Sequence, residues 1–195
     1  MKKAICLLLG LAAIGSLFAQ DNVVKRIPQV GYDSEQQNYA TMDQGFWMSA
    51  EALGAMSCHL EGSNMGLAEV DVTAGYRISQ YLKLGVGVGA RYYINQDGHR
   101  RSSIKWGMPV FATVRGNFIS SNYRTVVPYW GLEAGASIRD GMMVRPTIGV
   151  RIGEVRNAFT VGLSYMGQEL AILDKNGEKA EKYTNFVCIR LGYEF

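Results

Sequence analysis

The stretch AEVDVTAGYRISQYLKLGVGVGARYYI, residues 68–94, alternates apolar residues with polar residues or glycine in two runs, 68–78 and 82–94. Every even position is apolar in both runs, and a short turn separates them. A period of two residues gives a β-strand one apolar and one polar face. The stretch therefore predicts two antiparallel strands that follow one another around a tight turn.

The second face of these strands decides between a soluble and a membrane sheet. It carries glycines with isolated acids and arginines, such as Glu69, Asp71 and Arg91. The polar face of a soluble sheet would instead be covered by Lys, Glu and Thr. This composition fits the interior of a narrow barrel whose outside contacts lipid. The stretch therefore favours a membrane barrel.

The same alternation recurs along the chain and predicts six more strands. Their expected ranges are 46–57, 104–119, 127–139, 142–152, 158–167 and 183–195. These lengths match those of tilted membrane-spanning strands. We therefore expect an all-β, eight-stranded, antiparallel, up-and-down transmembrane β-barrel over residues 45–195. Pro109 and Pro146 fall within expected strands and predict bulges or weak spots, because proline donates no backbone hydrogen bond.

The first residues have the pattern of a secretory signal. Lys2 and Lys3 precede an apolar run at 4–17 and a small residue at the expected cleavage point, which predicts a signal peptide over 1–19. Residues 20–44 are polar without a sustained period, and we expect a flexible periplasmic lead segment.

The net charge, the cysteines and the histidines give little reason to expect nucleic-acid binding, a disulfide, catalysis or a metal site. Removal of the two signal lysines lowers the net charge from +3 to +1, which gives no electrostatic case for nucleic-acid binding. Cys58 and Cys188 invite a disulfide, but the alternation places them on opposite faces of their strands. His59 and His99 fall in expected loops and lack a triad or metal-ligand spacing. We therefore expect no catalytic, cofactor or metal site.

Loop lengths and aromatic residues suggest an orientation. The connections at 79–81 and 153–157 are short and those at 95–103 and 168–182 are long, as in barrels with periplasmic turns and outer loops. Two other turns depart from this pattern. Aromatic residues near strand ends would form a periplasmic belt (Phe46, Tyr76, Tyr81, Phe118, Trp130, Phe159, Tyr193, Phe195) and an outer belt (Tyr92, Tyr93, Trp106, Tyr165, Tyr183).

The expected last strand, 183–195, resembles that of a known family of proteins. It places apolar residues at alternate positions from Val187 and ends with Leu191, Tyr193 and Phe195. This pattern looks like the C-terminal signal that outer-membrane barrels present to the barrel-assembly machinery. Together with the signal peptide and the strand number, residues 45–195 resemble the small outer-membrane barrels of the OmpA/OmpX type. The resemblance implies a monomer in the outer membrane of a Gram-negative bacterium, with both termini periplasmic and loops that serve adhesion, defence or lipid contact.

The expected interior carries charged residues of both signs: Glu51, Glu69, Asp71, Arg77, Lys83, Arg91, Arg115, Glu133, Arg139, Arg145, Arg151 and Arg190. Buried charges must be paired, so these residues predict a polar network that plugs the lumen in a structural role. A narrow channel for ions or a small solute is the first alternative. A secreted, soluble, lipocalin-like barrel is the second, although glycines and charges make poor walls for an apolar ligand.

The long expected loop at 95–103 contains a basic cluster. Arg100 and Arg101, with Lys105 just beyond, could hold lipopolysaccharide phosphates by charge-assisted hydrogen bonds. Outer-membrane lipid and lipopolysaccharide are therefore the expected partners, besides the assembly machinery.

Overall fold

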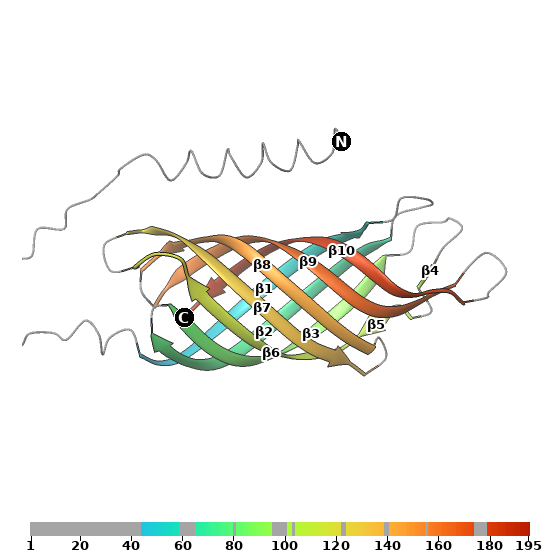
Figure 1. Ribbon diagram of the computed structural model, residues 1–195, viewed down its shortest axis with the longest axis horizontal. Helices are drawn as coiled ribbons and strands as arrows, with labels where there is room; N and C mark the ends of the chain where they lie inside the picture. Colours follow the sequence, from blue (N-terminus) through green and yellow to red (C-terminus); the bar gives the residue numbers. More distant parts are fainter. Residues whose placement is uncertain are drawn as a thin grey trace, which may run out of the picture. The chain divides into compact units, whose positions relative to one another are not determined.

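The chain forms a closed antiparallel β-barrel of eight strands, as seen in a computed structural model (Figure 1). The structure describes residues 44–58, 65–79, 81–94, 101–102, 104–121, 124–138, 141–154, 156–173 and 179–195. The described residues include no helix that is long and apolar enough to cross a membrane. The expected signal peptide and lead segment lie outside the described residues.

The barrel closes because the last strand pairs with the first. The strands are β1 (Gly45–Ser57), β2 (Gly66–Ser79), β3 (Leu82–Ile94), β4 (Arg101–Ser102), β5 (Trp106–Gly107), β6 (Pro109–Asn117), β7 (Val126–Ser137), β8 (Gly141–Gly153), β9 (Ala158–Leu173) and β10 (Lys179–Glu194). Each long strand pairs antiparallel with the next, and β5 and β6 together make the fourth strand of the barrel. The last strand, β10, pairs with both β9 and β1. The predicted fold class is confirmed.

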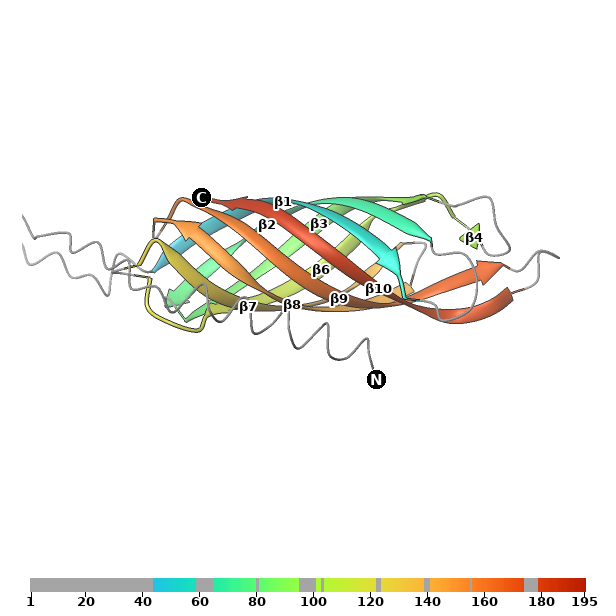
Figure 2. The same cartoon turned by 90° about the horizontal axis from the view of Figure 1, so that it is seen from above.

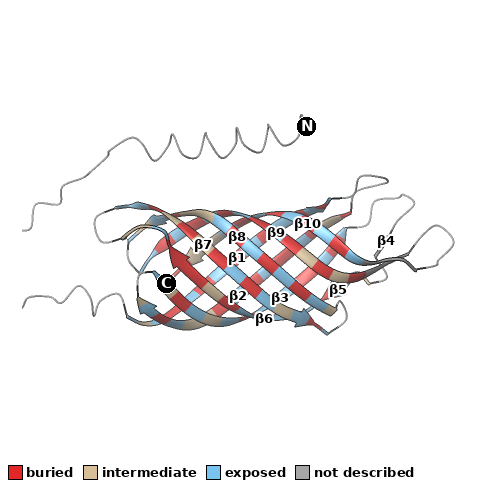
Figure 3. Cartoon of the chain, in the orientation of Figure 1, coloured by how far each residue is buried: buried red, intermediate tan, exposed pale blue. Residues whose placement is uncertain are grey.

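Burial alternates along the strands in step with the sequence (Figure 3). In β1, Trp47, Ser49 and Glu51 are buried, whereas Phe46 and Met48 are exposed. An eight-stranded barrel has an interior just wide enough for side chains, so the buried positions are those that point inward. The apolar positions of the alternation therefore face outward.

Both prolines mark irregular places in the sheet. The expected strand at 104–119 is broken at Met108, immediately before Pro109, and ends earlier, at Asn117. In β8, the register pairs with β9 stop at Val144↔Gly167 and resume at Thr147↔Ser164 without a shift. Pro146 lies in this gap and leaves its pairing with β7 intact. The predicted weak spots are confirmed as interruptions, without a bulge.

The expected loop at 168–182 is largely strand, which corrects the sequence analysis. β9 runs to Leu173 and β10 starts at Lys179, so the hairpin extends beyond the neighbouring strands (Figure 2). The alternation continues into this region, since Gln168 and Leu170 are buried. We name this end of the barrel the hairpin end.

At the opposite end of the barrel, which we name the terminal end, the start of β1 lies beside the end of the chain. The backbone N–H of Phe195 donates to the carbonyl of Met48 at 2.9 Å, and that of Met48 donates to the carbonyl of Phe195 at 3.4 Å. The cysteines do not form a disulfide: Cys58 is exposed, Cys188 is buried and both are free.

Candidate functional site

The lumen holds the charged residues that the sequence assigns to the interior. Arg139 lies outside the described residues, and each of the others is at most 4% exposed. Glu194, which the sequence analysis did not single out, is buried with them. Along β2, β3, β8 and β10 the inward charges fall into two groups. The terminal cluster comprises Arg77, Lys83, Arg151 and Glu194, and the central network comprises Glu51, Glu69, Asp71, Arg91, Arg115, Glu133, Arg145 and Arg190.

Glu133 on β7 is the acid with the most partners in the central network. Arg190 donates to both of its carboxylate oxygens at 2.7 Å, from β10. Arg115 donates to Oε1 at 2.8 Å and Arg145 to Oε2 at 2.6 Å. Such charge-assisted pairs, one of them bidentate, are the strong class of hydrogen bonds.

Arg145 on β8 connects opposite sides of the lumen. Its three guanidinium nitrogens donate to Glu133, to Glu69 at 2.8 Å and to Asp71 at 2.6 Å. Arg91 donates to Glu69 from β3. The network contains four carboxylates and four guanidinium groups, so it is neutral when all are ionised. This balance allows the charges to be buried together.

Arg115 extends the network to β1. It donates to both carboxylate oxygens of Glu51, one of them at 2.9 Å. The Arg115 guanidinium also lies 5.5 Å from the ring centre of Trp47. Trp47 is fully buried and donates from Nε1 to the carbonyl of Leu84 at 3.3 Å.

The terminal cluster gathers three cationic side chains around one carboxylate. Arg77 donates to Oε1 of Glu194 at 2.6 Å, Lys83 donates to the same oxygen, and Arg151 lies 3.7 Å from it. Lys83 Nζ is also 5.8 Å from the Trp47 ring centre. Trp47 therefore stands between the terminal cluster and the central network, with a cation on each side.

Towards the hairpin end the lumen is apolar, which the sequence analysis did not anticipate. The apolar layer comprises Leu53, Ala55, Met65, Leu67, Tyr93, Phe111, Met143, Met166, Leu170, Phe186 and Cys188. Only a loss of alternation could have revealed it: at 52–56 and 186–189 both strand faces are apolar or small. The expectation of a polar interior is therefore wrong for this part of the lumen.

Tyr93 belongs to this inner layer and not to the outer aromatic belt in which we expected it. It is 1% exposed, and Arg91 donates to its hydroxyl at 3.3 Å. It follows Tyr92, which points outward, so the alternation itself places it inside. The other belt residues lie exposed or half-buried on the outer wall.

Two glycines on β3 make room for lumen side chains. A Cβ at Gly89 would lie 2.1 Å from Oδ1 of Asp71, and one at Gly87 would lie 2.4 Å from the Phe111 ring. A larger residue at either position would therefore force the Asp71 carboxylate or the Phe111 ring to shift. The glycine run of β3 thus admits a carboxylate and an aromatic ring to the lumen.

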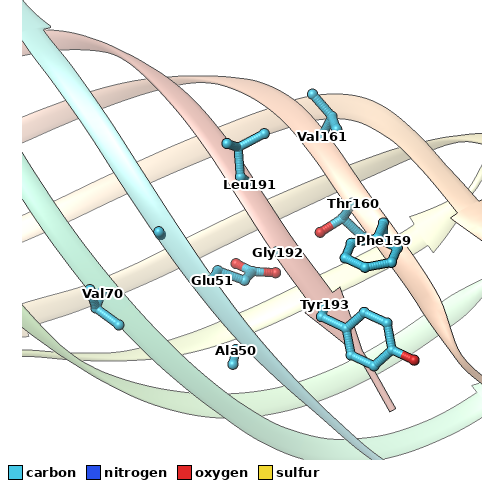
Figure 4. Close-up of a pocket in the computed structure, with 10 residues that line it drawn as sticks. Ala50, Glu51, Val70, Phe159, Thr160, Val161, Leu191, Gly192 and Tyr193 are labelled. Atoms are coloured by element: carbon cyan, nitrogen blue, oxygen red, sulfur yellow. The ribbon is translucent and has the colours of Figure 1, made fainter.

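The outer wall carries a hollow of about 530 Å³ across β1, β2, β9 and β10 (Figure 4). Ala50 and Ala52 form its floor beside larger residues such as Leu191 and Tyr193. Most of its lining residues are exposed and apolar, so the hollow belongs to the outward-facing surface.

The remaining predicted site residues that the structure describes lie apart from the lumen network. Leu191 and Phe195 are exposed and Tyr193 is half-buried on the outer face. Lys105 is exposed beside β5, whereas Arg100 and the side chain of Arg101 are outside the described part. Within the described residues, no group of three or more His, Cys, Asp or Glu side chains is arranged to hold a metal ion.

The sequence matches no family model and no curated protein. The fold is that of the eight-stranded outer-membrane barrels, in agreement with the class resemblance of the sequence. Among solved structures, the crystal structure of Neisserial surface protein A matches with a TM-score of 0.55 and 15% identity. The match covers 76% of this chain and 95% of that chain. At this identity the likeness establishes the fold.

Proposed function

We propose that this chain is a monomeric integral protein of a Gram-negative outer membrane, with a plugged lumen and a structural or surface-interaction role. The observation that carries the proposal is the reversed polarity of the barrel. Its outer wall is apolar, whereas charged side chains such as Glu133 and Arg145 are fully buried. We assign it no enzymatic activity and no cofactor.

Insertion in a bilayer explains the outer wall. Val70, Val86, Val88 and Ile189 are each more than half exposed in the middle of their strands. Soluble monomers rarely expose apolar patches of that extent. The uninterrupted strands have 12 to 16 residues, which is enough to cross a bilayer at a tilt. The wall therefore argues against the secreted, lipocalin-like alternative.

A periplasmic location of both termini is part of the proposal. Phe195 and the start of β1 lie at the terminal end. At that end only residues 80–81 separate β2 from β3, and residues 154–157 separate β8 from β9. Short turns face the periplasm in bacterial outer-membrane barrels. The extended β9–β10 hairpin would then reach outside the cell.

The plugged lumen is supported by the pairing of the central network. Each of its carboxylates contacts at least one guanidinium group within the barrel. Paired charges that fill an eight-stranded interior leave little space for a hydrated ion.

Membrane insertion is tested by comparing boiled and unboiled samples of the outer-membrane fraction on a detergent gel. A shift in mobility upon boiling is expected for a folded barrel. A protein recovered only in the soluble fraction, without a shift, would contradict the proposal. Conductance in a planar bilayer then tests the plug: no steady current is expected, and stable nanosiemens steps would favour the channel alternative.

Lipopolysaccharide contact remains part of the proposal through Arg100, Arg101 and Lys105. The exposed position of Lys105 near the hairpin end is compatible with it. Replacement of Arg100 and Arg101 with Ala should weaken lipopolysaccharide binding. Arg156→Ala provides the matched control, since Arg156 is exposed at the terminal end, beside Gln44. Equal binding by both variants would remove this assignment.

The assembly signal is proposed from the alternation that ends at Phe195. Truncation of Phe195 should slow insertion by the barrel-assembly machinery in isolated membranes. Phe118→Ala is the control, because Phe118 is similarly exposed but lies outside the terminal strand. Insertion at the wild-type rate after truncation would contradict the assignment.

A further inference from the structure

The apolar layer extends across the lumen. Its residues come from β1, β2, β3, β6, β8, β9 and β10. At this level β7, the remaining long strand, contributes Gly135, which pairs with Phe111 of β6. Phe186 and Met166 pair directly across β10 and β9, and both are fully buried. The members of the layer therefore include no charged side chain and few strong hydrogen-bonding groups.

The zone between the terminal cluster and the central network contains the Trp47 ring and, beside it, polar side chains. Thr73, Tyr129 and Thr160 point inward there from β2, β7 and β9. Their hydroxyls are buried and have no hydrogen-bond partner among the described residues. Buried polar groups of this kind are usually satisfied by ordered water. Glu51 and Thr160 both lie against Gly192 (Figure 4): a Cβ there would lie 2.6 Å from Cγ of Glu51 and 2.8 Å from Oγ1 of Thr160, so water bound at Thr160 would adjoin the central network.

The central network continues this polar path up to the apolar layer. Arg91 is its last member in that direction, and its Nη2 lies 3.2 Å from the sulfur of Met143 and 3.5 Å from that of Met166. The Arg145 guanidinium lies 5.3 Å from the centre of the Phe111 ring. Arg91 also donates through Nη1 to Oε1 of Gln168, which pairs with Met143 at the level of the layer, and Thr184 lies opposite Gln168. The charged groups therefore end where the layer begins, and Gln168 and Thr184 are buried polar side chains within it.

We propose that the lumen contains a latent path for water and protons that enters from the terminal end and is closed by the apolar layer. The inference rests on the proposed plugged membrane barrel and identifies which part of the plug seals it. An apolar constriction excludes water because water finds no hydrogen bonds there. The paired charges exclude hydrated ions. Their carboxylates can accept a proton from adjacent water and release it to water again, whereas the guanidinium groups keep their protons. The layer is then the barrier to protons and the network is the barrier to ions.

The test makes the layer polar without reducing its volume. Met143→Gln with Met166→Gln replaces two thioethers by amides of similar length, and each amide can accept from Arg91. The full chain is reconstituted in phosphatidylcholine vesicles with an entrapped pH-sensitive dye, and the internal pH is followed after an external acid pulse. Valinomycin and potassium compensate the moving charge. We expect proton entry to become at least about tenfold faster than in wild type, while potassium conductance stays at the wild-type level.

Two further variants separate sealing from damage to the fold. Met108→Gln with Met142→Gln introduces the same amides at exposed positions of the wall and should stay tight. Met143→Leu with Met166→Leu should also stay tight if apolar character, and not methionine itself, makes the seal. Folding of each variant is checked by its mobility shift upon boiling. If the inner Gln double variant does not fold, Met166→Gln alone, which also keeps the volume, takes its place.

The outcomes separate the inference from the proposed function. A folded inner Gln variant, double or single, that admits protons no faster than wild type would overturn the inference. Rapid proton entry through wild type would also overturn it, because the layer would not be a seal. Steady potassium conductance through wild type would instead overturn the plugged barrel itself.

Discussion

The central network and the apolar layer occupy adjacent lengths of one lumen, yet different forces stabilise them. In the network, a single carboxylate such as Glu133 serves three guanidinium groups. In the layer, side chains such as Phe186 and Met166 contribute through contact and exclusion from water. The network is therefore sensitive to loss of charge, whereas the layer is sensitive to loss of volume.

The network and the layer therefore contribute differently to the stability of the barrel. Buried ion pairs are weak evidence of stability, because desolvation offsets much of their attraction. A lumen filled only by charges would depend on complete pairing at every position. The apolar layer fills its part of the lumen without that requirement, and substitutions in the two regions should therefore behave differently.

The largest effect is expected for Glu133→Gln. Three guanidinium groups lose their shared carboxylate, and a buried charge left without compensation costs about 3–5 kcal/mol. The free energy of unfolding is measured by urea denaturation of the protein refolded in detergent micelles. Glu154→Gln is the matched control, because Glu154 is exposed at the end of β8. Similar midpoints for both variants would show that the network does not depend on its charge.

A smaller effect that depends on volume is expected in the layer. Met166→Ala should lower the free energy of unfolding by about 2–5 kcal/mol, because it leaves a cavity at a fully buried position. Met166→Leu keeps the volume and should cost less than about 1.5 kcal/mol. The same urea titration measures both. If the Leu variant were as unstable as the Ala variant, the Met166 sulfur and its contact with Arg91 would matter more than volume.

The sequence predicts the barrel well because its signal is local. Alternation over a run such as 82–94 assigns each residue to one face, and a one-residue error would move every side chain to the other face. The same alternation assigned Glu51 and Arg190 to the interior, where the structure places them. The barrel interior and the wall therefore follow from a pattern of neighbouring residues.

The partners within the lumen could not be predicted in this way. Arg145 contacts Glu69 and Asp71, which are 76 and 74 residues distant in the chain. These contacts cross the lumen, and they depend on strand tilt and stagger, which the alternation does not specify. The apolar layer was not predicted either, because inward residues such as Phe111 are as apolar as the outward residues beside them.

The smallest effect is expected at Trp47, between the terminal cluster and the central network. Trp47→Phe removes the hydrogen bond to Leu84 and weakens the contacts of the ring with Lys83 and Arg115. Together these losses should lower the free energy of unfolding by about 1–2 kcal/mol. Trp106→Phe is the control, since Trp106 is 61% exposed on the outer wall. Far-UV circular dichroism in the urea titration reports unfolding independently of the tryptophan removed. If Trp47→Phe costs no more than its control, the ring acts only as filling between the two charged groups, and the polar part of the lumen is stabilised by its ion pairs alone.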